Sequence, residues 1–291
     1  MLKIVDGIPF IGRSTDSYRV KAHDLGHGHM EVVTSRVIEW QEADWAPGVM
    51  ADHLEVVRKY KEEHPNEIEA RNRQRAARRA RTRVRRLVKA MGADTLLTLT
   101  YRACEGDLGR AKADLKEFNR RMLRELPGFR FVACFELQRR GAWHMHLATA
   151  GLPPFFERTN STGQVYRVKS FDVFRSVWRS VTKDRGGNVD VARRKRNSQR
   201  GAAKIASYIA KYIGKAFAES MEAGTNRWTK YGAVEVAQPV ELGVVGSLLD
   251  SLGIAYGIIA DAQAVATARL DGFRDWFFLA AELPRVRPGG T

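Results

Sequence analysis

The amino-acid sequence predicts an α+β fold: a central antiparallel sheet flanked by helices, with a long basic N-terminal helix and a helical C-terminal segment. Three observations lead to this prediction. Runs with the alternation or residue types of strands are interspersed with amphipathic segments that have helical spacing. Residues 67–91 contain no Gly or Pro and consist mostly of good helix formers. Residues 240–283 are apolar with a helical period.

The elements that follow the basic helix can be assigned in order. Residues 94–102 alternate and are rich in Leu and Thr, which favours a strand, whereas residues 107–126 have apolar residues three and four apart, which favours a helix. The strand-like runs 129–137 and 142–150 are separated by a short polar connection with Gly141, which is typical of a hairpin. The remaining expected elements are a β-like run at 30–40, a hairpin at 155–168, a helix at 170–182, a strand at 187–192, a helix at 198–221 and a strand around 226–237.

Composition indicates a folded, strongly cationic protein. The 291 residues include 49 Lys+Arg against 33 Asp+Glu, a formal net charge of +16, and the sequence pI is near 10.1. Such a chain is expected to bind a polyanion. Hydrophobic residues make up 44% of the sequence, which is enough for a true core and argues against disorder along the whole chain.

Cysteine content and hydropathy indicate the compartment. Two cysteines, Cys104 and Cys134, exclude a disulfide framework and a zinc site built from CxxC thiolates, so a reducing cytosol is expected. The most apolar tract is interrupted by Asp250 and Asp261, and it is too short to span a bilayer. The first 30 residues have scattered charges and no pattern of a secretory signal. We therefore expect a cytoplasmic protein with no membrane partner.

The basic helix is the first candidate for nucleic-acid binding. It carries ten basic residues and no acidic residue between Arg71 and Lys89, and a helix of this kind repels itself unless a polyanion lies nearby. A solvated helix face is the alternative, but such a face normally mixes both signs of charge. The residues expected to contact phosphates are Arg71, Arg75, Arg78, Arg79, Arg85 and Arg86.

A metal site is predicted on the hairpin. His144 and His146 are two residues apart on one strand, so both imidazoles lie on the same face. Glu136 lies on the partner strand, where cross-strand pairing brings its carboxylate beside the rings. Two imidazoles and one carboxylate leave open positions on a divalent ion for water and substrate oxygens. The alternatives are a structural HxH pair and a zinc hydrolase, which lacks a third His or Cys at a suitable spacing.

A candidate nucleophile follows on the helix at residues 198–221. Tyr208 and Tyr212 are four residues apart, with Lys211 between them, and Lys204 and Lys215 lie on the same stripe. A tyrosine hydroxyl that attacks phosphorus needs a nearby cation, which Lys211 can supply. Tyrosines at this spacing are more often packing residues, but a buried pair would not need three lysines on its face.

A second basic stretch, residues 192–200, immediately precedes this helix. We expect its arginines to contact phosphates that flank a cut site, and the alternative is a flexible solvated loop. The sequence contains no GxxxxGK[ST] motif, so any unwinding must come from a second motor protein. The additional candidate DNA-binding residues are Arg193, Arg194, Arg196, Lys204 and Lys215.

The segments TLTYR, E…RGAWHMH and YIAKYIGK, in this order, resemble the three motifs of HUH endonucleases. Within that superfamily the chain looks like the rolling-circle replication initiators of single-stranded DNA bacteriophages: the YxxKY pattern is similar to their two-tyrosine class, and the basic helix is similar to filamentous-phage replication proteins. The resemblance implies a ferredoxin/RRM-like HUH endonuclease domain at residues 65–236. Residues 1–64 remain an N-terminal segment of unknown role, and residues 237–291 form the C-terminal helical segment.

The resemblance also implies a role for each matching residue. His144, His146 and Glu136 would hold Mg²⁺ or Mn²⁺, with Thr98 and Thr100 as structural neighbours of the metal. Tyr208 or Tyr212 would attack, which leaves a 5′-phosphotyrosine and a free 3′-OH. The implied partners are single-stranded or supercoiled origin DNA, with a host helicase and DNA polymerase, in the cytoplasm of a bacterial host cell.

Two other functions remain open. An HUH transposase or a relaxase-type nickase would use the same chemistry, although a single-tyrosine transposase needs only one nucleophile. A non-catalytic protein that binds single-stranded nucleic acid would account for the charge, but it would leave the HxH and YxxKY motifs unexplained.

Overall fold

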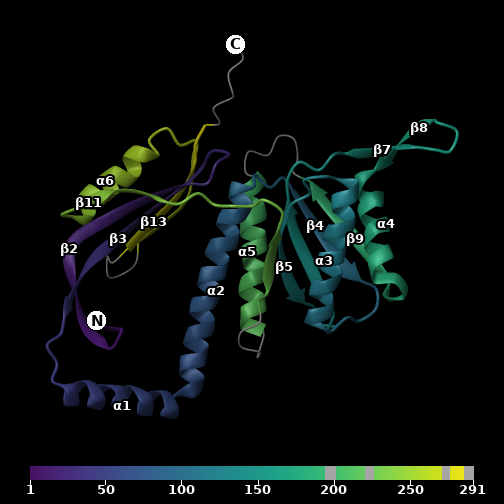
Figure 1. The fold of residues 1–291 in the computed structure, drawn as a ribbon. Helices are drawn as coiled ribbons and strands as arrows, with labels where there is room; N and C mark the ends of the chain where they lie inside the picture. Colours follow the sequence, from purple (N-terminus) through teal and green to yellow (C-terminus); the bar gives the residue numbers. More distant parts are fainter. Residues whose placement is uncertain (194–200, 220–225, 271–275, 285–291) are drawn as a thin grey trace. The chain divides into compact units, whose positions relative to one another are not determined.

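The computed structural model describes residues 1–193, 201–219, 226–270 and 276–284, and it divides the chain into two compact units. Unit 1 comprises residues 1–71 and 237–291, and unit 2 comprises residues 72–236. Figure 1 shows the elements of both units. Among the described residues, no helix is both long and apolar enough to cross a membrane.

Unit 1 is an antiparallel sheet with one helix packed on it. The strand order is β1-β2-β3-β13-β12, and β11 pairs with β2. Helix α6 packs through Ala255 and Ile259 on Val20, Val32 and Leu279 of the sheet. The elements of this unit are β1 (Leu2–Val5), β2 (Ile8–Asp24), β3 (His29–Glu42), α1 (Pro47–Glu63), β11 (Val240–Val245), α6 (Leu248–Ile258), β12 (Ala264–Leu270) and β13 (Trp276–Glu282).

The helical prediction for the C-terminal segment is wrong for most of its length. Only α6 is helical among the described residues between 240 and 283, and β11, β12 and β13 are strands. β13 consists almost entirely of apolar residues, and a continuous apolar run is compatible with either a buried strand or a buried helix. Pairing with β3, more than 200 residues earlier in the sequence, decides between the two.

Unit 2 contains the central antiparallel sheet, with strand order β10-β5-β6-β4-β9. The predicted α+β class is confirmed, as are the expected strands, hairpins and helices of this region. The hairpin turn between β5 and β6 places Gly141 at φ +82°, a conformation that favours glycine. The strands are β4 (Thr95–Tyr101), β5 (Phe131–Leu137), β6 (Trp143–Thr149), β7 (Phe155–Thr159), β8 (Val165–Lys169), β9 (Gly187–Arg193) and β10 (Trp228–Tyr231).

Helices cover both faces of this sheet (Figure 1). The helices are α2 (Pro65–Ala90, in unit 2 from residue 72), α3 (Leu108–Glu125), α4 (Ser170–Thr182), the 3-10 helix η1 (Lys183–Arg185) and α5 (Gly201–Glu219). On one face, α3 and α4 enclose an aromatic core in which the rings of Phe118 and Trp178 meet edge to face at 5.9 Å. The Trp178 Nε1 also donates to the carbonyl of Thr100 at 2.8 Å, so α4 is attached directly to β4.

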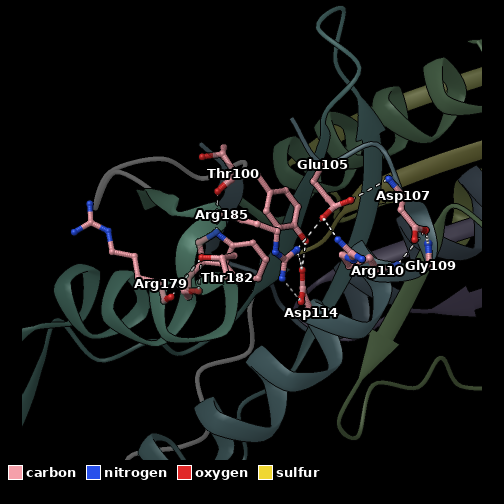
Figure 2. A network of polar contacts seen from close by, with 11 residues as sticks. Thr100, Glu105, Asp107, Gly109, Arg110, Asp114, Arg179, Thr182 and Arg185 are labelled. Atoms are coloured by element: carbon pink, nitrogen blue, oxygen red, sulfur yellow. Dashed lines mark hydrogen bonds and ion pairs between the residues drawn. The ribbon is translucent and has the colours of Figure 1, made fainter. Parts of the chain in front are cut away.

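A buried ionic network braces the same side of the sheet (Figure 2). The Arg185 guanidinium donates to both carboxylate oxygens of Asp114, at 2.6 and 3.0 Å, and to Glu105 at 2.9 Å. The Tyr101 hydroxyl donates to Asp114 at 2.8 Å, and burial together with this bond raises the pKa of Tyr101. One arginine thereby joins the end of β4, the loop after it, α3 and η1.

On the opposite face, α2 and α5 pack on the sheet. Helix α2 buries a stripe that includes Val84 and Leu87, and α5 contributes Ala206 and Ile209 to the same cluster. This stripe explains why α2 is a stable helix despite its arginines, because the apolar positions recur every three or four residues and leave the basic ones outward. Lys89, counted above with the basic face, is instead buried, with 4% of its surface exposed.

Candidate active site

The register of three strands assembles the candidate metal ligands. Glu136 on β5 lies opposite His144 on β6, and His146 lies between Cys134 on β5 and Thr98 on β4. Directly opposed residues in an antiparallel pair share a face. The two histidines and the carboxylate therefore stand on the α2/α5 face of the sheet, away from the aromatic core.

His146 is the centre of this arrangement. Its Nε2 lies 2.9 Å from Glu136 Oε2, and its Nδ1 lies 3.2 Å from the Thr98 hydroxyl oxygen. A carboxylate only accepts, so Nε2 donates to Glu136, and in the neutral ring Nδ1 accepts from Thr98. The side chain is almost fully buried, so these two contacts hold the ring in one orientation.

His144 lies beside it on the same strand, with its ring centroid 6.5 Å from that of His146. Burial, and next the proximity of His146, lowers the pKa of His144 to about 4. Its imidazole is therefore neutral near pH 7, which is the form that binds a metal ion.

The residues present fit a divalent cation. Two ligand atoms bound at right angles to one octahedral ion are roughly 3 Å apart when each bond is about 2.1 Å, and the separation of His146 Nε2 from Glu136 Oε2 is 2.9 Å. The ligand set of two imidazoles and a carboxylate is suitable for such an ion. As they stand, no three His, Cys, Asp or Glu side chains within the described residues are already gathered as a metal-binding group.

The two predicted nucleophiles lie against His146. The Tyr212 ring stacks on the imidazole, with centroids 4.2 Å apart and planes 26° apart, whereas Tyr208 meets it edge-on at 5.8 Å. The Tyr212 hydroxyl donates to the Tyr208 hydroxyl oxygen at 2.9 Å. Desolvation, followed by this hydrogen bond, raises the pKa of Tyr208.

Helix α5 brings the tyrosines here because of its amphipathic pattern. Ala206 and Ile209 are buried against the sheet, and the tyrosines lie at the border between this apolar stripe and the lysines. Lys204 and Lys211 are exposed, and neither is paired with an acidic side chain in the part of the chain that is described. The Lys215 side chain lies outside the described residues.

The predicted DNA-binding arginines differ in accessibility. On α2 they are all outward-facing or partly so: Arg71, Arg75, Arg78 and Arg79 are exposed, and Arg85 and Arg86 are half-buried. Arg193 is exposed at the end of β9 and donates to the Pro153 carbonyl at 2.7 Å. Arg194 and Arg196 lie outside the described residues.

Two neighbours of the site were only partly foreseen from the sequence. Thr98 contacts His146 directly, but Thr100 donates to the Asn188 carbonyl at 3.2 Å instead. Cys134, opposite His146, was assigned no role; it is fully buried, and desolvation raises the pKa of its thiol. Its alternation with Glu136 along β5 was the available signal that it lies beneath the same face.

Comparison with known proteins identifies one family. Residues 94–217 match the model of a family of replication-associated proteins of the ORF2 type. The matched segment runs from the start of β4 into α5 and so contains the candidate ligands and both tyrosines. No curated protein and no solved structure matches the chain. The family match supports a replication-initiator family for this chain.

Proposed function

We propose that the chain is a DNA strand nickase and strand-transferase that initiates and terminates rolling-circle replication of a phage or plasmid genome. The family match supports a replication initiator, and the site on the α2/α5 face supports nicking by tyrosine. The observation that carries the proposal is the contact of both tyrosine rings with His146, whose Nε2 is paired with Glu136.

The chain contains an internal contrast for these tyrosines. Tyr101 is a packing tyrosine: 2% of its surface is exposed, and its hydroxyl is bound to a buried carboxylate. Tyr208 is 39% exposed, and its hydroxyl is bound only to that of Tyr212 in the described structure. A hydroxyl with this accessibility can reach a phosphate that arrives from solvent.

His144, His146 and Glu136 would hold Mg²⁺ or Mn²⁺. When bound, the ion supplies a Lewis acid that polarises the scissile phosphate. Thr98 keeps the His146 ring in position through Nδ1, which is the usual task of a residue behind a ligating histidine.

In the proposed reaction a tyrosine oxygen attacks phosphorus, and the bond from phosphorus to the 3′ oxygen breaks. The phenolic proton passes to solvent, and the departing 3′ oxygen gains a proton, so the products are a 5′-phosphotyrosine and a free 3′-OH. Lys211 offsets the charge on the phosphoryl oxygens. The free 3′-OH primes synthesis, and the second tyrosine later cleaves the regenerated origin.

The charge distribution supports DNA binding by unit 2. Unit 2 carries 36 Lys+Arg against 14 Asp+Glu, whereas unit 1 carries 13 against 19. The outward arginines of α2 lie on the helix that covers the face of the site, so they are suited to hold phosphates of the same DNA. A host helicase and DNA polymerase are the further partners that this function requires.

The test is the formation of a covalent protein–DNA adduct. The protein is incubated with labelled single-stranded circles of the replicon that encodes it, with Mn²⁺, and denatured products are separated by size. We expect a labelled adduct that needs Mn²⁺ and is absent from the Tyr208→Phe/Tyr212→Phe double variant. Tight binding with no adduct would favour a non-catalytic binding protein. Cleavage restricted to transposon-end or transfer-origin sequences would favour a transposase or relaxase.

A further inference from the structure

The two tyrosines are held in different ways, and their geometry sets an order of use. We infer that Tyr208 makes the first cleavage and that Tyr212 is kept in reserve until Tyr208 is occupied. The inference rests on the proposed function and adds to it the sequence in which the nucleophiles act.

The first argument is accessibility. Tyr208 is 39% exposed and touches His146 only edge-on, at 5.8 Å between ring centroids. Tyr212 is half-buried, with its ring stacked on the imidazole and packed against the cluster between α2, α5 and the sheet. A phosphate that approaches from solvent therefore meets the Tyr208 oxygen before it meets that of Tyr212.

The second argument is the direction of the hydrogen bond between the hydroxyls. Tyr212 donates its proton to the Tyr208 oxygen at 2.9 Å. Negative charge that develops on the Tyr208 oxygen during attack strengthens this bond, so Tyr212 assists the first cleavage as a donor. While it donates, the Tyr212 hydroxyl is directed at its neighbour and not at the phosphate.

The same bond provides a release step. In the first reaction the Tyr208 oxygen forms a bond to phosphorus and the 3′ oxygen leaves. The Tyr208 oxygen is then an aryl ester oxygen, which is a weaker hydrogen-bond acceptor than a phenol or phenolate oxygen. The Tyr212 hydroxyl loses its acceptor and becomes available for a second phosphate.

The second round balances in the same way. The Tyr212 oxygen bonds to phosphorus at the regenerated origin, and a new 3′-OH is released there. This 3′-OH attacks the phosphorus held by Tyr208, which joins the displaced strand into a circle and returns Tyr208 as a free hydroxyl. The spacing of four residues lets both hydroxyls serve one site, since their rings are 4.7 Å apart.

The experiment is single-turnover cleavage of a single-stranded oligonucleotide that carries the nick site, mapped beforehand with the wild-type protein and Mn²⁺. The attached residue is identified by peptide mass in wild type, Tyr208→Phe and Tyr212→Phe. Phenylalanine keeps the ring contacts, and thermal unfolding confirms that each variant is folded.

We expect the wild-type adduct on Tyr208. Tyr212→Phe should form the same adduct about five-fold more slowly, the size of one neutral hydrogen bond. Tyr208→Phe should be slower by roughly 100-fold or more, with any adduct on Tyr212. When a second oligonucleotide is added to the preformed adduct, strand joining should need Tyr212.

Other results overturn the order. A wild-type adduct on Tyr212, an equal division between the two residues, or wild-type cleavage by Tyr208→Phe would each show that Tyr208 does not act first, while nicking itself stands. Absence of any adduct with the wild-type protein would instead overturn the proposed function, and the inference with it.

Discussion

The two faces of the five-stranded sheet in unit 2 are built from the same strands but have different roles. The α3/α4 face is an aromatic core braced by the Arg185 network, whereas the α2/α5 face combines a small apolar cluster with His146, Glu136 and the tyrosines. Neighbouring residues alternate between the two, so that Met145 belongs to the core and His146 to the site.

This division teaches that fold and chemistry can be changed separately in this protein. A substitution on the α3/α4 face should act on the free energy of unfolding, and one on the α2/α5 face should act on cleavage. The predictions below either break this separation or sharpen it, beginning with the largest expected effect.

The double variant His144→Ala/His146→Ala should lose strand cleavage while keeping its fold, because it removes both imidazole ligands but leaves the aromatic core intact. Adduct formation with Mn²⁺ measures the activity, and circular dichroism with thermal unfolding measures the fold. Cleavage by the double variant at the normal rate, in the presence of a chelator, would show that the metal site is wrongly assigned.

Arg185→Gln should destabilise the fold by about 3–5 kcal/mol, because it leaves the buried carboxylates of Asp114 and Glu105 without their shared cation. The free energy of unfolding in urea is the measurement. Arg110→Gln is the matched control: Arg110 is exposed and lies 3.8 Å from the same Glu105, so its loss should cost no more than about 0.5 kcal/mol. Equal costs for the two variants would mean that the network does not brace this face.

Lys211→Ala should slow both cleavage and joining by roughly 10²-fold, the loss expected for one group that stabilises transition-state charge. Lys211→Arg, which keeps the charge, is the control and should retain most of the rate. Single-turnover rates at saturating DNA separate this effect from weaker binding. If Lys211→Ala changes only the DNA affinity, the residue is a phosphate contact and takes no part in the chemistry.

Thr98→Val should weaken metal binding by roughly 10- to 100-fold, because it removes the hydroxyl that holds His146 through Nδ1. The readout is the Mn²⁺ concentration at half-maximal cleavage, which should rise while the rate at saturating Mn²⁺ changes little. Thr98→Ser restores a hydroxyl and should restore the metal dependence. A lower rate at every Mn²⁺ concentration, with no shift in the midpoint, would contradict this positioning role.

Replacement of Arg78, Arg79, Arg85 and Arg86 by Gln should have the smallest effect on the chemistry and a distinct effect on binding. The logarithm of affinity falls with the logarithm of salt concentration in proportion to the phosphates contacted, by about 0.7 per contact for a single strand. The variant should therefore show a flatter slope. Arg58→Gln/Lys59→Gln, on α1 of the acidic unit 1, is the control that should leave the slope unchanged. An unchanged slope in the α2 variant would assign this helix to another partner.

Much of unit 2 could be predicted from the sequence because the relevant patterns are local. The spacing of His144 and His146 orients both rings to one face once the strand exists, and the spacing of Tyr208 and Tyr212 makes them neighbours once the helix exists. The strands, hairpins and helices of residues 94–237 were predicted from alternation, amphipathic spacing and a glycine-containing turn, all of which are properties of short windows.

The features that sequence did not determine depend on pairing between distant segments. The apolar residues of β13 became a strand because β3 supplies its hydrogen bonds, and Thr98 meets His146 because β4 pairs with β6 in one register. Likewise, the unequal contacts of the two tyrosines with His146 follow from the way α5 packs on β5 and β6. By itself the sequence specified which side chains share a face of their own element; tertiary packing decided which element lies opposite, because that choice is made by non-local hydrogen bonds and burial.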